Sequence, residues 1–273
     1  TEEEIAKRLG GEEVDDALVC SMLDIINNCA WEEICDTDGI KIYKTKLDEH
    51  MEIAGREMGG AAKFLCVKAE AVLDATPEEV YKLFVDNTRV GEYNEFCKQI
   101  HDLQYINQTT KITWSASGRI GPFKERDFVT RVHYRSLEDG TLLVANRAED
   151  HPKAPQTDRY LRMEIVVGGN IMKAAPGEKG KTHFTMLTHV NPGGVAETRL
   201  GTIIMNGAAA NGPLKFVQGL RACLVRDSLG VPPPKMLDES AAHAQEVEFG
   251  RFLLEARMSE TKKILQTCPA GIT

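Results

Sequence analysis

Residues 182–194 read THFTMLTHVNPGG and mark the point where a long series of strands ends and a helix begins. Apolar and polar side chains alternate through residues 182–190, which is typical of a half-buried strand. Asn191-Pro192-Gly193-Gly194 then supplies turn residues. Five further strand patterns precede this one, at residues 98–106, 111–119, 128–135, 141–147 and 160–167. Six consecutive strands without an intervening helix predict antiparallel pairing.

The loops between these strands are marked by turn residues. They are Gly121-Pro122, Asp139-Gly140, Pro152–Pro155, Gly168-Gly169 and Pro176-Gly177. Within the strand at 111–119, Ile112, Trp114 and Ala116 alternate, and we expect this face to point inward.

Helical patterns flank the strands on the N-terminal side. Apolar residues recur at three- and four-residue spacing through 12–35, which predicts a helix. A short strand is predicted at 40–45 and a long strand at 61–73, with a loop at 55–60 between them. Thr76-Pro77 followed by Glu79 is typical of a capping box at a helix start. Residues 89–96 are expected to be irregular.

Beyond the last strand, residues 197–229 carry a long helical pattern that Asn211-Gly212-Pro213 should bend or break. Pro232-Pro233-Pro234 predicts a stiff linker, and a final helix is expected over 239–266. We therefore divide the chain into an N-terminal helical segment (1–38) packing on a central domain (39–230), and a linker with a C-terminal helix (231–273).

Composition narrows the functional classes. The 273 residues carry a net charge of -8, which argues against general nucleic-acid binding, since that needs clustered positive charge. No window approaches eighteen consecutive apolar residues, so no span of a bilayer is predicted. Seven irregularly spaced cysteines favour a reducing compartment, and we expect a cytoplasmic, monomeric protein.

One motif resembles a phosphate-binding loop. Residues 175–182 read APGEKGKT, which satisfies the relaxed pattern. That chemistry needs a helix directly after the loop, whereas residues 183–188 alternate as a strand. We therefore interpret the segment as a hairpin turn. No metal or nucleophile pattern stands out either, and we expect no enzyme activity, cofactor or metal.

Several short motifs in a fixed order resemble the START lipid-transfer family, and within it the phosphatidylcholine transfer branch. They are Gly39-Ile40-Lys41-Ile42-Tyr43, residues 121–129 (GPFKERDFV), Asn191-Pro192-Gly193-Gly194, Asn211-Gly212-Pro213 and Leu220-Arg221-Ala222-Cys223. The resemblance covers about residues 31–226. It implies an α+β helix-grip fold, in which a curved antiparallel sheet grips a long, kinked C-terminal helix around a lipid.

The resemblance also implies ligand residues. Trp114 and Phe128 fall where the choline branch places aromatic rings around the quaternary ammonium, a cation–π device, and Val166 falls at its third aromatic position. Arg89 or Val90 matches an arginine near the headgroup. The remaining candidates are Tyr93, Asn94, which replaces an aspartate, Arg162, Ile204 and Ala208. The acid–base pair of the sterol-binding members falls at Ser115 or Ala116 and at Val132.

Arg162 allows two interpretations. It shares a face with Glu164 by parity, and if that face is inward its charge needs a partner such as Glu164 or a phosphate. If the face is outward, Arg162 is an ordinary structural residue.

The sequence thus predicts a protein that binds and transfers, or senses, a single phospholipid or other membrane lipid in an apolar interior, with transient membrane contact. The resemblance points to the C-terminal helix and the turn at 191–196 as the gate. Two alternatives stay open: an enzyme on the same fold, such as a cyclase or hydrolase, and a regulatory interaction module.

Overall fold

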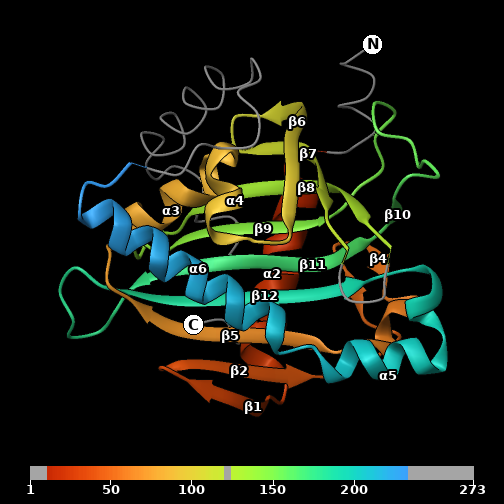
Figure 1. Cartoon of the computed structure of the whole chain (residues 1–273), viewed down its shortest axis with the longest axis horizontal. Coiled ribbons are helices and arrows are strands. Elements are labelled where there is room, and N and C mark those ends of the chain that lie inside the picture. The colour runs from red at the N-terminus through yellow and green to blue at the C-terminus, as the bar shows by residue number, and fades with distance from the viewer. Residues whose placement is uncertain (1–10, 120–123, 233–273) are drawn as a thin grey trace.

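One large sheet organises the molecule (Figure 1). The computed structural model of the chain describes residues 11–119 and 124–232. Within them the sheet order is β1-β2-β5-β12-β11-β9-β8-β7-β6, with antiparallel pairs throughout, and β10 adds a short parallel pairing with β8. The strands are β1 (Glu32–Thr37), β2 (Ile40–Thr45), β5 (Cys66–Leu73), β6 (Cys97–Asn107), β7 (Thr110–Ser117), β8 (Arg126–Ser136), β9 (Leu142–Ala148), β10 (Leu161–Arg162), β11 (Glu164–Ala174) and β12 (Thr182–Asn191). The predicted antiparallel sheet is confirmed.

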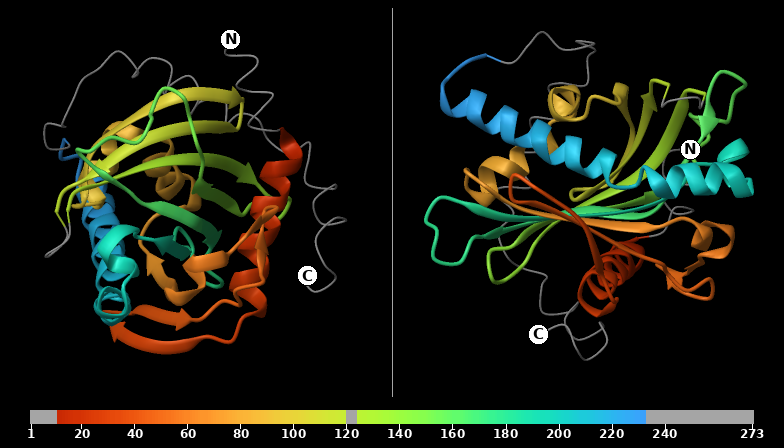
Figure 2. Two further views of the ribbon diagram at one scale, coloured as in Figure 1. Left: turned by 90° about the vertical axis from the view of Figure 1, so that its right-hand side faces the viewer. Right: turned by 60° about the horizontal axis from the view of Figure 1, so that its bottom comes forward.

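Helices cover both faces of this sheet. They are α2 (Glu12–Asn28), α3 (Pro77–Val85), α4 (Val90–Tyr93), α5 (Arg199–Gly207) and α6 (Asn211–Ser228), with 3₁₀ turns η1 (Gly59–Lys63), η2 (Asn87–Arg89) and η3 (Gly194–Glu197). Figure 2 shows the curved sheet with α5 and α6 along its open side and α2 on the opposite side. A small hairpin, β3 (Glu52–Ile53) with β4 (Arg56–Glu57), lies outside the main sheet. This is the predicted α+β helix-grip arrangement.

The N-terminal helix is shorter than predicted. α2 ends at Asn28, and residues 32–37 form β1, which pairs with β2 through a tight turn at Asp38-Gly39. Both turn residues have positive φ, 52° and 70°. The pairing of β1 with β2 extends the sheet, and this long-range interaction overrides the local helical pattern. Trp31 lies between α2 and β1 rather than inside a helix.

The predicted loop at Gly168-Gly169 is wrong, because both glycines lie inside β11. A Cβ on Gly169 would lie 2.3 Å from Met22 Sδ and 2.4 Å from Val144 O. The missing side chain therefore lets α2 pack closely on the convex face of the sheet. Its apolar partners there include Leu143, Ala145, Val167 and Leu187.

A buried ion pair fixes the same helix to the sheet. Asp15 on α2 accepts hydrogen bonds from Arg131 Nε at 2.7 Å and Thr110 Oγ1 at 2.7 Å. The side chains of Asp15 and Arg131 are 1% and 0% exposed. His133, on the same face of β8, receives a hydrogen bond from Arg135 Nε. Burial lowers the pKa of His133 to about 3, so the ring is neutral at physiological pH.

Two predictions made from local sequence patterns, at the start of α3 and at residues 175–181, agree with the structure. Thr76 and Glu79 form the predicted capping box at the start of α3. Residues 175–181 connect β11 to β12, and Ala174 pairs with Thr182. Lys181 pairs with Asp74 and Glu178 instead of facing a helix N-terminus. The interpretation of APGEKGKT as a hairpin turn is confirmed. Residues 89–96, expected to be irregular, contain α4.

The long helical pattern breaks as predicted, with α5 ending at Gly207 and α6 starting at Asn211. None of the described helices is long and apolar enough to cross a membrane. The predicted final helix (239–266) and part of the 121–129 motif lie outside the described residues.

Candidate functional site

The concave face of the sheet, which α6 covers, is the candidate site. The cross-strand registers and the core that packs under α6 identify the side chains on this face of the central strands. They are Phe128, Thr130, Val132 and Tyr134 on β8; Leu142, Val144 and Asn146 on β9; Gly168, Asn170 and Met172 on β11; and Phe184, Met186 and Thr188 on β12. All of these residues are uncharged. Arg126, at the start of β8, lies on the same face by the register, and it is a buried cation that donates to Lys124 O.

This face divides into a filled half and a half that is partly exposed. Near α3, Phe84 stacks on Phe184 with ring centroids 6.0 Å apart, and Tyr81 meets Tyr134 edge-on. Those concave residues are almost completely buried. Toward the other end five residues keep partial exposure although they lie on the covered face: Phe128, Val132, Asn146, Met186 and Thr188. Ala209, Ala210 and Leu214, from the junction of α5 and α6, are partly buried against the same core.

A buried charge pair borders this half, which sequence reasoning missed. Lys111 lies opposite Val132 in the register, and its Nζ is 3.0 Å from Asp102 Oδ2. Asp102 also accepts hydrogen bonds from Asn87 Nδ2 at 2.8 Å and Tyr105 OH at 2.6 Å. The lysine side chain is 0% exposed and the aspartate 4%. The charge of Lys111 is therefore compensated inside the protein. Three separate elements, η2, β6 and β7, contribute to this cluster, so no local sequence motif indicates it.

The register separates two aromatic candidates that the sequence placed together. Phe128 pairs with Ser115, whereas Trp114 pairs with Val129. Directly opposed residues share a face, so Phe128 and Ser115 face the concave side and Trp114 faces the convex side. The expectation that Ile112, Trp114 and Ala116 point inward is wrong. These three residues do share one face of the strand, but alternation alone does not determine which face points to the interior.

Trp114 belongs to a polar cluster on the convex face. Its Nε1 donates to Asp127 Oδ2 at 3.0 Å, and its ring contacts Tyr160 edge-on. Arg162 grips the same aspartate through Nε and Nη2, each at 2.9 Å, and also donates to Ala154 O. The partner of Arg162 is therefore Asp127, neither Glu164 nor a phosphate, and the outward, structural interpretation applies.

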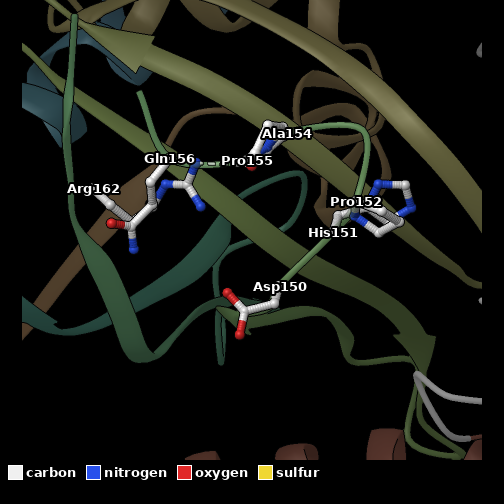
Figure 3. A pocket seen from close by; sticks show the side chains of 7 residues that line it. All are labelled: Asp150, His151, Pro152, Ala154, Pro155, Gln156 and Arg162. Carbon is white, nitrogen blue, oxygen red and sulfur yellow. Dashed lines mark hydrogen bonds between the residues drawn. The ribbon is translucent and has the colours of Figure 1, made fainter. Parts of the chain in front are cut away.

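A pocket of about 250 Å³ lies beside this cluster (Figure 3). Residues of the loop after β9 and Arg162 line it: Asp150, His151, Pro152, Ala154, Pro155, Gln156 and Arg162. Ala154 packs with Ile112 and Val129, which places the pocket on the convex side of the sheet. Val166 is also absent from the concave face. A bulge between Ile165 and Val167 turns it toward the core under α2.

Three other candidates lie where α4 meets α6. Arg89 binds Glu92 at 2.8 Å and Asp227 at 2.9 Å, so its charge is compensated by carboxylates of this chain. Tyr93 is buried and donates to Leu83 O. Asn94 Oδ1 accepts from Phe96 N at the end of α4. These residues fasten helices together, and they lie apart from the partly exposed half of the sheet.

Comparison with known proteins matches this arrangement. The START domain family covers residues 44–228, about two thirds of the chain. The chain belongs to the START domain family. The family predicted from the short motifs is thereby confirmed.

Named relatives of this START domain include lipid-transfer proteins. The chain is 29% identical over 161 residues to the mitochondrial steroidogenic acute regulatory protein of Danio rerio, covering 56% of this chain and 53% of that protein. It is 20% identical to the phosphatidylcholine transfer protein of Bos taurus, over 72% of this chain and 86% of that one. The chain thus spans about half the length of the steroidogenic proteins it matches. Human StAR-related lipid transfer protein 5 shares the fold, with a TM-score of 0.68 and 16% identity over 83% of this chain and 99% of that one.

The two helices on the open side of this START domain are fastened differently. Asn206, near the end of α5, accepts a hydrogen bond from Leu65 N at 3.0 Å and donates to Lys63 O at 3.2 Å. On α6, Arg226 and Asp227 bind Glu92 and Arg89 in a partly buried ionic cluster. Ala208 lies at the junction and is exposed.

The outer surface of α5 and η3 is apolar. Val195, Leu200 and Ile203 are 67%, 68% and 61% exposed. Ile204, predicted to contact the ligand, is 44% exposed and joins this group. We call Val195, Leu200, Ile203 and Ile204 the α5 patch.

Proposed function

We propose that this START domain binds one lipid against the partly exposed half of the concave face and carries it between membranes. The observation that supports the proposal most directly is the partial exposure of Val132, Met186 and Phe128 beneath the covering helices. Apolar surface left in contact with water costs about 25 cal/mol per Å². A lipid chain lying there removes that cost, and the lipid avoids about 0.8 kcal/mol for each methylene otherwise exposed in transit.

The proposal is a carrier rather than an enzyme. Acid–base catalysis needs titrating groups that face the substrate. The concave residues of β8, β9, β11 and β12 named above are uncharged except Arg126, which stays protonated and donates to Lys124 O. The nearby Lys111–Asp102 pair is closed on itself by Asn87 and Tyr105. Of the predicted ligand residues, Phe128 remains a candidate beside the bound chain, and the exposed Ala208 remains one only at the junction of α5 and α6. The cytoplasmic location and the monomeric state remain predictions.

Filling the proposed binding space should block loading. Replacing Val132 with tryptophan places a large ring in the partly exposed half, so we expect lipid occupancy after incubation with liposomes to fall at least tenfold. Native mass spectrometry of the full chain measures the occupancy, and thermal unfolding checks that the variant is folded.

Trp114→Leu is the matched control, because Trp114 lies on the convex face of the neighbouring strand. Its occupancy should equal that of the wild type. Unchanged loading in a folded Val132→Trp variant would rule out the concave site. Reduced loading in Trp114→Leu alone would move the site to the convex pocket.

The α5 patch is the proposed membrane contact. Exposed apolar side chains on a helix beside the open side of the grip can enter the headgroup region of a bilayer. The double substitution Leu200→Ser and Ile203→Ser should slow lipid transfer between donor and acceptor vesicles at least fivefold, while the amount of bound lipid stays the same. Val225→Ser on α6 removes a comparably exposed residue, 56%, outside the patch, and transfer should be unaffected. Equal slowing by both substitutions would contradict the assignment.

A further inference from the structure

An unsatisfied polar atom lies in the middle of the concave face. Oδ1 of Asn170 is buried and has no hydrogen-bond partner among the described residues. The residue sits on β11 between Val144 of β9 and Met186 of β12, and both neighbours face the same side. A buried acceptor that has left water without finding a donor destabilises the protein. An acceptor of this kind indicates that a bound molecule supplies the missing hydrogen-bond donor.

Two further polar groups surround Asn170. Gly168 lies between Asn146 on β9 and Thr188 on β12 in the register. A Cβ on Gly168 would lie 2.5 Å from Asn146 Oδ1, so the amide of Asn146 covers the glycine. Asn146 and Asn170 are diagonal neighbours on adjacent strands, a spacing that lets side chains meet a common group. We call Asn146, Asn170 and Thr188 the amide patch.

The amide patch has a definite chemical preference. Its members are uncharged. Lys111, which borders the same face, is already compensated by Asp102, and Arg126 lies at the start of β8, away from Val132 and its partner Asn146. An ionised phosphate placed against the patch would lose its water without gaining a counter-charge, which is strongly unfavourable. A phosphodiester also has no hydrogen to donate to Asn170 Oδ1. A hydroxyl or an amide N–H has one, and a hydroxyl can accept from a neighbouring amide as well.

We propose that the amide patch recognises the polar end of an uncharged lipid that carries a hydrogen-bond donor, a hydroxyl or an amide N–H, with Asn170 as the specificity-determining residue. This inference rests on the proposed function, since it names the class of lipid bound at the same concave site. Phosphatidylcholine, which has no donor, is disfavoured.

Competitive loading tests the proposal on the full chain. The protein is incubated with vesicles containing equal amounts of diacylglycerol, ceramide, cholesterol and phosphatidylcholine, and native mass spectrometry counts which lipid is bound. We expect the preferred donor-bearing lipid to exceed phosphatidylcholine at least tenfold, which corresponds to about 1.4 kcal/mol. The O-methyl ether of the preferred lipid, which lacks the donor, should load no better than phosphatidylcholine.

Asn170→Leu separates recognition from structure. The substitution removes the unsatisfied acceptor and keeps the branched shape of the side chain, so the lipid-free variant should unfold at the same temperature as the wild type or higher. The preference for donor-bearing lipids should fall to about that of the ether. Ile171→Leu, on the opposite face of the same strand, should keep the wild-type preference.

The outcomes are distinct. A wild-type preference for phosphatidylcholine, equal loading of the lipid and its ether, or an undiminished preference in Asn170→Leu would each overturn the role of the amide patch. If no lipid of any class loads, the proposed function itself fails.

Discussion

Replacing Asp15 with alanine is expected to lower the free energy of unfolding by about 3–5 kcal/mol. The carboxylate is the partner of Arg131, whose side chain is completely buried under α2. Without it the guanidinium keeps its charge in a site that excludes water, and Thr110 Oγ1 loses its acceptor as well. Urea denaturation followed by circular dichroism measures the loss.

Asp24→Ala on the same helix provides the control. Asp24 hydrogen-bonds Asn28 at the surface, so its removal should change stability by no more than about 0.5 kcal/mol. If Asp15→Ala costs less than about 1 kcal/mol, the attachment of α2 depends on its apolar face alone, and the ion pair contributes little.

The second large effect is expected at Gly219 in the middle of α6. A Cβ there would lie 2.4 Å from the carbonyl oxygen of Tyr93 and 2.9 Å from its carbonyl carbon. Backbone atoms cannot rotate away as a flexible side chain can, so Gly219→Ala must push α6 off α4. We expect a loss of about 1–3 kcal/mol in unfolding free energy. The displacement should also lengthen the ion pair between Glu92 and Arg226, and bound lipid should dissociate faster.

Gly212→Ala is a matched change within the same helix. A Cβ at Gly212 meets nothing within 4 Å, and alanine favours helix by up to about 1 kcal/mol relative to glycine. The two substitutions should therefore move the unfolding temperature in opposite directions. A stabilised Gly219→Ala protein would show that α6 can shift without cost.

Sequence patterns predicted the elements of this fold better than their boundaries. The capping box at Thr76 and the break before Asn211 were readable because each depends on neighbouring residues. β1 was not, because residues 32–37 become a strand only by pairing with β2. Gly168-Gly169 resembled a loop for a similar reason. The pair is there to admit Met22 of α2, which lies far away in the chain.

The candidate site was harder to predict than the fold. The resemblance implies that Trp114 and Phe128 both contact the ligand, yet the strand register puts them on opposite faces of the sheet. A shift of one residue between two strands exchanges their inside and outside, and no local pattern fixes that shift. Asn170 lies in a segment whose alternation is interrupted by the bulge at 165–167, so its inward direction could be seen only once β11 had been paired with β9 and β12.

The two helices on the open side of the sheet differ in how strongly they are attached, and α5 has the weaker attachment. Two hydrogen bonds of Asn206 join α5 to residues 63–65, whereas α6 is held by a partly buried ionic cluster and close backbone contact. These two hydrogen bonds involve neither α2 nor α6, so for the proposed carrier we expect α5 to open locally, without global unfolding, when the lipid enters or leaves. In the proposed carrier, the stability of the fold and the rate of lipid exchange therefore depend on different residues. Mutation can change the rate of exchange without lowering the stability.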